Sequence, residues 1–153
     1  MNKKIIFGLL VGIVVVGGLF ILGTLKHSSV ESKANGLEDK IVKAEKVEVF
    51  LFHATRRCPT CVAIGKLASE TVDEYFKSEL QAGKIEFREI NIDLLENKTL
   101  AEKFQASGSA LFINAIYADQ DNISEDLQVW QLTQDKAQFK AYLKNKLDNL
   151  IKE

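Results

Sequence analysis

Cysteine, proline and net charge are all scarce in this sequence. Two cysteines among 153 residues are too few for the several disulfides that hold small secreted domains together. The formal net charge of -1 lacks the basic excess typical of nucleic-acid-binding domains, so no nucleic-acid partner is expected. No Gly-x-Gly-x-x-Gly run occurs either, and we therefore expect no nicotinamide or flavin cofactor.

One long apolar run does occur, near the amino terminus. Residues 5–25 carry no charge, and 15 of these 21 residues are Ile, Leu, Val or Phe. A helix of this length spans about 30 Å, the thickness of the hydrocarbon core of a bilayer. Lys3 and Lys4 make residues 1–4 a basic segment of the kind that stays in the cytoplasm. The pattern predicts a single-pass signal anchor in the inner membrane, with the remainder of the chain outside the cytoplasm, in the periplasm.

A cleaved secretory signal is the alternative interpretation of this run. The apolar core of such a signal is usually about 7–15 residues long, and a small-x-small cleavage site follows it. The run here is longer, and Gly23-Thr24-Leu25 is a poor match to such a site. Residues 26–46, which are polar and highly charged, are interpreted as a linker, and residues 47–153 as the folded domain.

Hydrophobic periodicity within residues 47–153 alternates between that of strands and that of helices. Strands are predicted at 47–52, 84–93, 110–117 and 127–132, the second with an irregularity near Glu89 and the last two joined by a turn at 119–122. Helices are predicted from Pro59 to Leu80, over 99–105 and over 139–151, the first ended by Gly83. The fold class is therefore α/β, in the order β-α-β-α-β-β-α.

Both cysteines fall at the amino terminus of the first predicted helix, in the run Cys58-Pro59-Thr60-Cys61. Pro59 suits the first turn, where its missing N–H would have no intrahelical partner. A helix amino terminus offers free N–H groups and a partial positive charge, which favour a thiolate over a thiol. We expect Cys58, nearer the helix end, to be the attacking nucleophile, and Cys61, one turn further in, to resolve mixed disulfides.

Three charged or titratable side chains precede the pair. Arg56 and Arg57 would stabilise the thiolate, and make the disulfide more oxidising, if they turn toward the sulfur; otherwise they are solvated or bind an external anion. His53 is a candidate proton shuttle for Cys61 or a third metal ligand. The less specific interpretation of His53 is a histidine that simply makes hydrogen bonds at a strand end.

This order of strands and helices around a Cys-x-x-Cys motif resembles the thioredoxin-like superfamily, over residues 47–151. Within it, the run FHATRRCPTC at residues 52–61 is similar to the small bacterial ArsF-family proteins, described as a subunit of a nitrophenyl compound nitroreductase. The resemblance implies a thioredoxin-like fold and thiol chemistry at the cysteines. It supplies an assignment but little mechanism.

Three departures from ordinary thioredoxins stand out. The superfamily places a cis-proline before its third strand, where it helps to hold the substrate, whereas this chain has Ser109 there and its only proline is Pro59. A non-proline cis bond would cost several kcal/mol, so we expect a trans peptide. The acid that thioredoxins bury on the first strand is absent, with His53 the nearest polar substitute. Arg57 replaces the usual tryptophan.

The sequence thus favours a membrane-anchored thiol-disulfide oxidoreductase that works on a dedicated protein partner. Two alternatives stay open. One is capture of a soft metal or metalloid by Cys58 and Cys61, with His53 as third ligand. The other is an interaction domain in which the disulfide is purely structural, although a disulfide that closes so short a loop contributes little stability.

Overall fold

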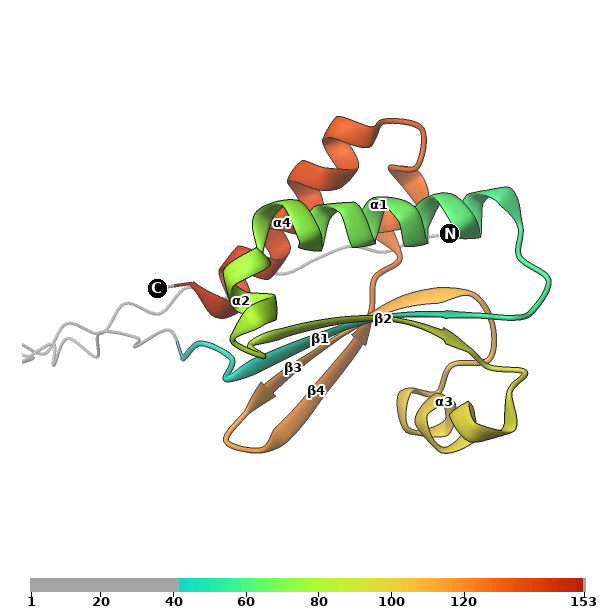
Figure 1. Cartoon of the computed structure of the whole chain (residues 1–153), viewed down its shortest axis with the longest axis horizontal. Helices are drawn as coiled ribbons and strands as arrows, with labels where there is room; N and C mark the ends of the chain where they lie inside the picture. Colours follow the sequence, from blue (N-terminus) through green and yellow to red (C-terminus); the bar gives the residue numbers. More distant parts are fainter. Residues whose placement is uncertain (1–41, 153) are drawn as a thin grey trace, which may run out of the picture. The chain divides into compact units, whose positions relative to one another are not determined.

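The computed structural model describes residues 42–152, which fold around one four-stranded sheet (Figure 1). The strands lie in the order β2-β1-β3-β4, with β1 parallel to β2 and antiparallel to β3, and β4 antiparallel to β3. Their bounds are β1 Lys46–His53, β2 Ile85–Asn91, β3 Ala110–Tyr117 and β4 Gln120–Glu125. The helices are α1 Pro59–Tyr75, α2 Lys77–Gln81, α3 Lys98–Phe104 and α4 Lys136–Ile151, with short 3-10 turns η1 Leu95–Asn97 and η2 Gln128–Gln131. The predicted α/β class is confirmed, and the types of element follow the predicted order, with α2 as an addition and the fourth strand formed by other residues than predicted.

Helices cover the sheet on both sides. Helices α1 and α4 lie on one face and α3 on the other (Figure 1). Alternation along β1 explains both layers, because successive side chains of a strand point to opposite faces. Val49 and Leu51 belong to the core under α1 and α4, whereas Phe50 and Phe52 pack with Phe104 of α3 in a second core. Both faces of β1 are therefore apolar, which is why this strand appears in the sequence as a continuous hydrophobic run.

The first predicted helix is two helices. Helix α1 ends at Tyr75, and Phe76 leaves helical geometry, with φ -129° and ψ 28°. The Phe76 side chain is fully buried in the core under α1. The apolar spacing continues across the break into α2, so periodicity alone did not reveal it. Gly83 follows α2 with φ +70°, a conformation that favours glycine.

The irregularity predicted near Glu89 is absent, because β1 and β2 pair without interruption from Val47–Ile85 to His53–Asn91. The change in hydrophobic alternation has another cause. Ile85 packs into the core under α1 and α4, whereas Ile90 packs into the core with α3. The strand buries opposite faces at its two ends, and this leaves Glu89 on the α1 side.

The strand predicted at 127–132 is wrong. The partner of β3 is β4, which is mostly exposed, and a two-residue turn with positive φ at Ala118 and Asp119 connects the two strands. As a polar edge strand, β4 carries little hydrophobic signal. The apolar residues after it form η2 instead, where Val129 is fully buried in the core.

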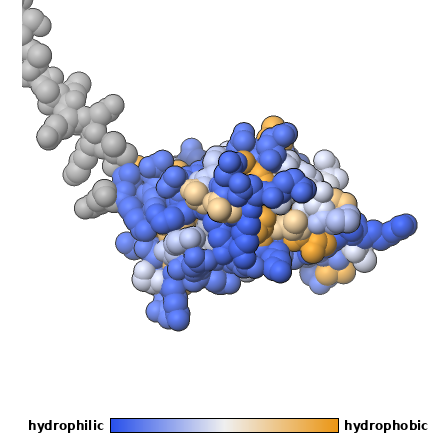
Figure 2. Space-filling view, turned by 90° about the horizontal axis from the view of Figure 1, so that it is seen from above, coloured by the Kyte–Doolittle hydropathy of each residue, from blue (hydrophilic) through white to orange (hydrophobic). Residues whose placement is uncertain are grey.

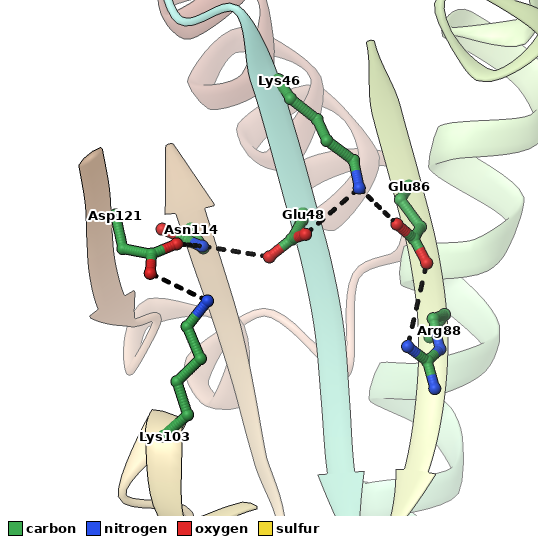
Figure 3. Close-up of polar contacts among 7 residues, drawn as sticks. All are labelled: Lys46, Glu48, Glu86, Arg88, Lys103, Asn114 and Asp121. Atoms are coloured by element: carbon green, nitrogen blue, oxygen red, sulfur yellow. Dashed lines mark hydrogen bonds and ion pairs between the residues drawn. The ribbon is translucent and has the colours of Figure 1, made fainter. Parts of the chain in front are cut away.

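A polar network lies on the same face of the sheet as α3, near the β3–β4 turn, where the helix does not cover the strands (Figure 3). Asn114 is fully buried, and its Nδ2 donates to Glu48 at 3.0 Å and to Asp121 at 2.6 Å. Lys46 links Glu48 to Glu86, at 3.1 and 2.6 Å. The network pairs basic side chains with carboxylates and is therefore internally neutralised; its charged members are Lys46, Arg88, Lys103, Glu48, Glu86 and Asp121.

The folded part begins before Val47. Ala44 is buried in the core, and its N–H donates to the Leu150 carbonyl at the end of α4. Within residues 42–152, none of the helices is long and apolar enough to cross a membrane. The anchor predicted at 5–25 and its basic segment 1–4 lie outside the described residues. Figure 2 shows the side of α1 and α4 as mostly hydrophilic, with apolar atoms in small patches.

Candidate functional site

Cys58 and Cys61 form a disulfide where β1 has ended and α1 begins, with their Cα atoms 5.2 Å apart. Cys58 is the N-cap of α1, in an extended conformation, and Pro59 is the first helical residue, as predicted. The Cys58 sulfur accepts a hydrogen bond from the Cys61 N–H at 3.1 Å. A free N–H of the helix end thus points at this sulfur, which is the local geometry that stabilises negative charge there.

The two cysteines differ in exposure to solvent. Cys58 is exposed, whereas Cys61 is only 5% exposed and belongs to the buried face of α1. This difference is the one expected from their order along the helix. Of the two cysteines, Cys58 is therefore the more accessible to a molecule from solution.

The Arg57 guanidinium makes two polar contacts beside the first turn of α1. Its Nη1 donates to Glu89 Oε2 of β2 at 2.5 Å, and its Nη2 donates to the backbone carbonyl of Cys61 at 3.2 Å. The guanidinium therefore lies beside the first turn of α1 but is paired with a carboxylate. Arg56 is exposed. Of the two arginines, Arg57 is ion-paired within the domain, and the sequence did not predict its partner Glu89.

His53 ends β1 with its side chain 13% exposed. Its Nδ1 lies 2.9 Å from the Ala54 carbonyl, and its Nε2 lies 4.0 Å from Glu89 Oε2. His53 thus makes a local hydrogen-bond contact at the end of a strand, which is the less specific of the two interpretations of this residue. Among residues 42–152, no three His, Cys, Asp or Glu side chains are grouped so as to hold a metal ion, so His53 does not join the two cysteines in a ligand set.

The loop before the disulfide is tied to the end of β2. The Thr55 N–H donates to Asp93 Oδ2 at 2.7 Å, and the Thr55 hydroxyl accepts from Asn91 Nδ2 at 3.1 Å. The backbone hydrogen bond from Thr55 is the main reason that the pKa of the Asp93 carboxyl lies below its usual value. These bonds fix the path of the chain from β1 into the disulfide.

The loop that contains Ser109 leaves the same end of the sheet. Ala110 begins β3 and pairs with Phe52, next to the point where β1 runs into the disulfide loop. The described residues contain no cis peptide, so the bond before Ser109 is trans, as expected. A small cavity of about 130 Å³, lined by residues 105–110 together with Phe112 and Glu125, lies at this loop.

Sequence reasoning missed two residues that the fold brings to the site, Glu89 and Asp93. Neither belongs to a recognisable motif, and both come from β2 or the loop after it. One signal was present for Glu89, since it stands where a third apolar residue would continue the alternation of Ile85 and Phe87. Gly65 on the buried face of α1 is the complementary signal, because it leaves space there.

Comparisons with known proteins show a likeness to solved structures. No family model matches this chain, and no curated protein matches it. Among solved structures, the chain is similar to the solution structure of an uncharacterised thioredoxin-like protein from Clostridium perfringens. The two are 16% identical, the match covers 77% of this chain and 90% of that chain, and the TM-score is 0.46.

Proposed function

We propose that this chain is a membrane-anchored, extracytoplasmic thiol-disulfide oxidoreductase of the thioredoxin-like superfamily, which cycles Cys58 and Cys61 between dithiol and disulfide. One observation carries the proposal. The disulfide joins an exposed cysteine to a buried one at the first turn of a helix, shortly after the central strand β1. That placement makes one sulfur the point of attack and the other a shielded leaving group.

In the direction that reduces this protein, the exchange has two steps. A thiolate of a protein dithiol attacks the Cys58 sulfur, the Cys58–Cys61 bond breaks, and Cys61 leaves with the electron pair and takes up a proton. The second partner thiol loses its proton and attacks the partner sulfur of the mixed disulfide, so that Cys58 leaves and is protonated. Two electrons and two protons pass to this protein, and the partner becomes a disulfide. The reverse direction uses the same steps in reverse order.

The nature of the partner follows from the features around the site. The cysteines need no resident cofactor for this exchange, so the partner supplies or accepts the electrons as a second protein thiol or disulfide. Ser109 occupies the loop that leaves the same sheet end, and we assign it a part in seating the partner chain. Since the loop carries no proline, a dedicated partner is favoured over a broad range of unfolded substrates.

The cellular location belongs to the same proposal. Residues 5–25 would anchor the chain in the inner membrane, and residues 26–46 would lead to a domain that works in the periplasm, where disulfides persist. The likeness to the ArsF family rests on residues 52–61 alone. If the anchor holds, the chain stays in membranes after carbonate extraction, and a variant without residues 1–25 is released.

The decisive test is a redox titration of the full-length chain in detergent, with alkylation of the reduced protein. We expect a potential above about -300 mV and selective labelling of Cys58 over Cys61, since structural disulfides lie below that value. A lower potential together with an unreactive Cys58 would identify a structural disulfide and overturn the proposal.

Trapping identifies the attacking sulfur and the partner together. In Cys61→Ser the resolving thiol is missing, so a mixed disulfide with the partner should accumulate on Cys58. Cys58→Ser is the matched control and should trap nothing, because the remaining thiol is buried. Equal trapping by both variants would contradict the assigned roles.

A further inference from the structure

Glu89 of β2 lies on the face of the sheet that packs against α1. It pairs in register with Leu51 of β1, and its side chain reaches the buried face of α1, where a Cβ on Gly65 would lie 2.6 Å from Glu89 Oε1. Gly65 is one helical turn beyond Cys61. A carboxylate of β2 is thus held against the helix that carries the cysteines, at a position that only a glycine leaves open.

Arg57 completes this arrangement. One guanidinium nitrogen donates to Glu89 and another to the carbonyl of Cys61, and Nη2 would lie 2.8 Å from a Cβ on Gly65. The side chains of Arg57 and Glu89 are only 19% and 35% exposed. The pair is therefore partly removed from water, where charges act on their neighbours more strongly than at an open surface.

We propose that Glu89 is a positioning residue that sets the reduction potential of the Cys58–Cys61 pair by holding and neutralising Arg57 beside the first turn of α1. This rests on the proposed function, in which reduction creates a thiolate at either cysteine. Arg57 favours that negative charge, and Glu89 opposes it. With both present, the two effects largely cancel, and the helix end is left as the main source of stabilisation.

The proposal predicts shifts of opposite sign when each charge is removed alone. Glu89→Gln leaves an uncompensated guanidinium beside Cys61, which stabilises the thiolates and makes the disulfide more oxidising. Arg57→Met leaves an uncompensated carboxylate, which makes it more reducing. Each should change the equilibrium constant with glutathione by roughly three- to tenfold, for unit charges at the partly buried helix end. The double variant should return close to the wild-type value.

The test measures that equilibrium constant, and the pH midpoint of Cys58 alkylation, for the full-length chain and these three variants. The midpoint should fall in Glu89→Gln and rise in Arg57→Met. His53 lies near Glu89, so all equilibrium constants are compared at one fixed pH. Glu86→Gln is the matched control, because Glu86 is also ion-paired on β2 but lies in the polar network on the other face (Figure 3). It should leave both quantities unchanged.

A merely structural pair would give a different result. Loss of either partner would then weaken the fold and shift the equilibrium constant in one common direction or not at all, and the double variant would not return to wild type. That outcome overturns the role proposed for Glu89. The proposed function is judged separately, and it stands as long as the wild-type disulfide exchanges with glutathione. If the wild-type disulfide does not exchange, the proposed function itself fails. Urea unfolding of each variant confirms that it is folded in the assay.

Discussion

Gly65 and Glu89 are in contact across the interface between α1 and β2, and the absence of a side chain at Gly65 makes the contact possible. A Cβ at that position would lie 2.6 Å from both Glu89 Oε1 and Leu51 Cδ2, closer than carbon atoms in proteins approach such neighbours. The glycine is helical and needs no unusual backbone angle. Its presence in the middle of a helix is therefore explained by space for the Arg57–Glu89 pair.

Replacement of Gly65 by alanine should lower the free energy of unfolding. Alanine gains about 1 kcal/mol over glycine at an unhindered helix position, but overpacking against Leu51 and the ion pair costs about 1–3 kcal/mol. We expect a net loss, measured by urea unfolding, and a displaced Arg57–Glu89 pair. Gly108→Ala is the matched control, because nothing lies within 4 Å of its added Cβ, and it should be neutral or slightly stabilising. If Gly65→Ala instead raises the free energy of unfolding by about 1 kcal/mol, the space beside Gly65 is not filled by its neighbours.

Asp93 should control how firmly the loop before the disulfide is held. The pKa of its carboxyl lies below the usual 3.8, chiefly because it accepts the Thr55 N–H. A depressed carboxyl pKa means that the interaction is complete above the usual value and is lost as the pH falls through the lower folded value. Asp93→Ala should speed hydrogen exchange at the Thr55 amide several-fold at neutral pH.

Hydrogen exchange followed by NMR provides the comparison. Glu96→Ala in η1 removes a nearby exposed carboxylate and should leave the Thr55 amide as protected as in the wild type. Equal exchange rates in Asp93→Ala and the wild type would mean that the loop is held by the Asn91 contact instead.

The sequence was most informative where burial alone decides the structure. The strand 110–117 was predicted with its observed bounds, because it is apolar and buried along most of its length. Strand β4 was missed for the opposite reason. It lies at the sheet edge, only Ile123 packs against a core, and its place is fixed by the turn at Ala118 and Asp119. Neither residue is a glycine, so the turn has a weak sequence signature.

At the site, local sequence identified the cysteines and their order of exposure but not their charged neighbour. Pro59 and the helix that follows make the position of the cysteines predictable from spacing. The partner of Arg57 comes from another strand, 32 residues away, and depends on the parallel register of β1 and β2. Long-range register is a property of the whole sheet, so the pairing of Arg57 with Glu89 could be recognised only with the fold in hand. The role of Ser109 stays a prediction.

Alkaline pH should destabilise the protein through Asp126. This carboxylate is 2% exposed and accepts hydrogen bonds from the Tyr142 hydroxyl at 3.0 Å and from Lys146 at 2.9 Å. Burial, followed by the Asp126 charge, raises the pKa of Tyr142. For Lys146, burial acts to lower the pKa but is outweighed by the hydrogen bond and charge of Asp126, so the pKa is raised.

Because the pKa values of Tyr142 and Lys146 are both raised in the folded protein, both groups affect stability in the same direction as the pH changes. Their contribution to stability is complete below the usual values of 10.0 and 10.5 and is lost as the pH rises through the folded values. Urea unfolding should therefore give a free energy that falls above about pH 10. Tyr142→Phe should be less stable at neutral pH but decline less steeply in alkali. Tyr117→Phe, which removes a hydroxyl from β3 at the turn end of the sheet, is the matched control. An unchanged alkaline slope in Tyr142→Phe would refute this assignment.

Asn114 should be the residue of the polar network that least tolerates a negative charge. It is fully buried, and its Nδ2 donates to both Glu48 and Asp121 (Figure 3). Asn114→Asp keeps the shape but replaces a shared donor with a third carboxylate, so the variant should lose about 2–4 kcal/mol of unfolding free energy at neutral pH. Repulsion and burial would raise the pKa of the new carboxyl, and its protonated form can donate again, so stability should recover as the pH falls. Urea unfolding at mildly acidic and neutral pH tests this, with Asn145→Asp on an exposed part of α4 as control. A loss that is equal at both pH values would indicate disturbed packing rather than charge.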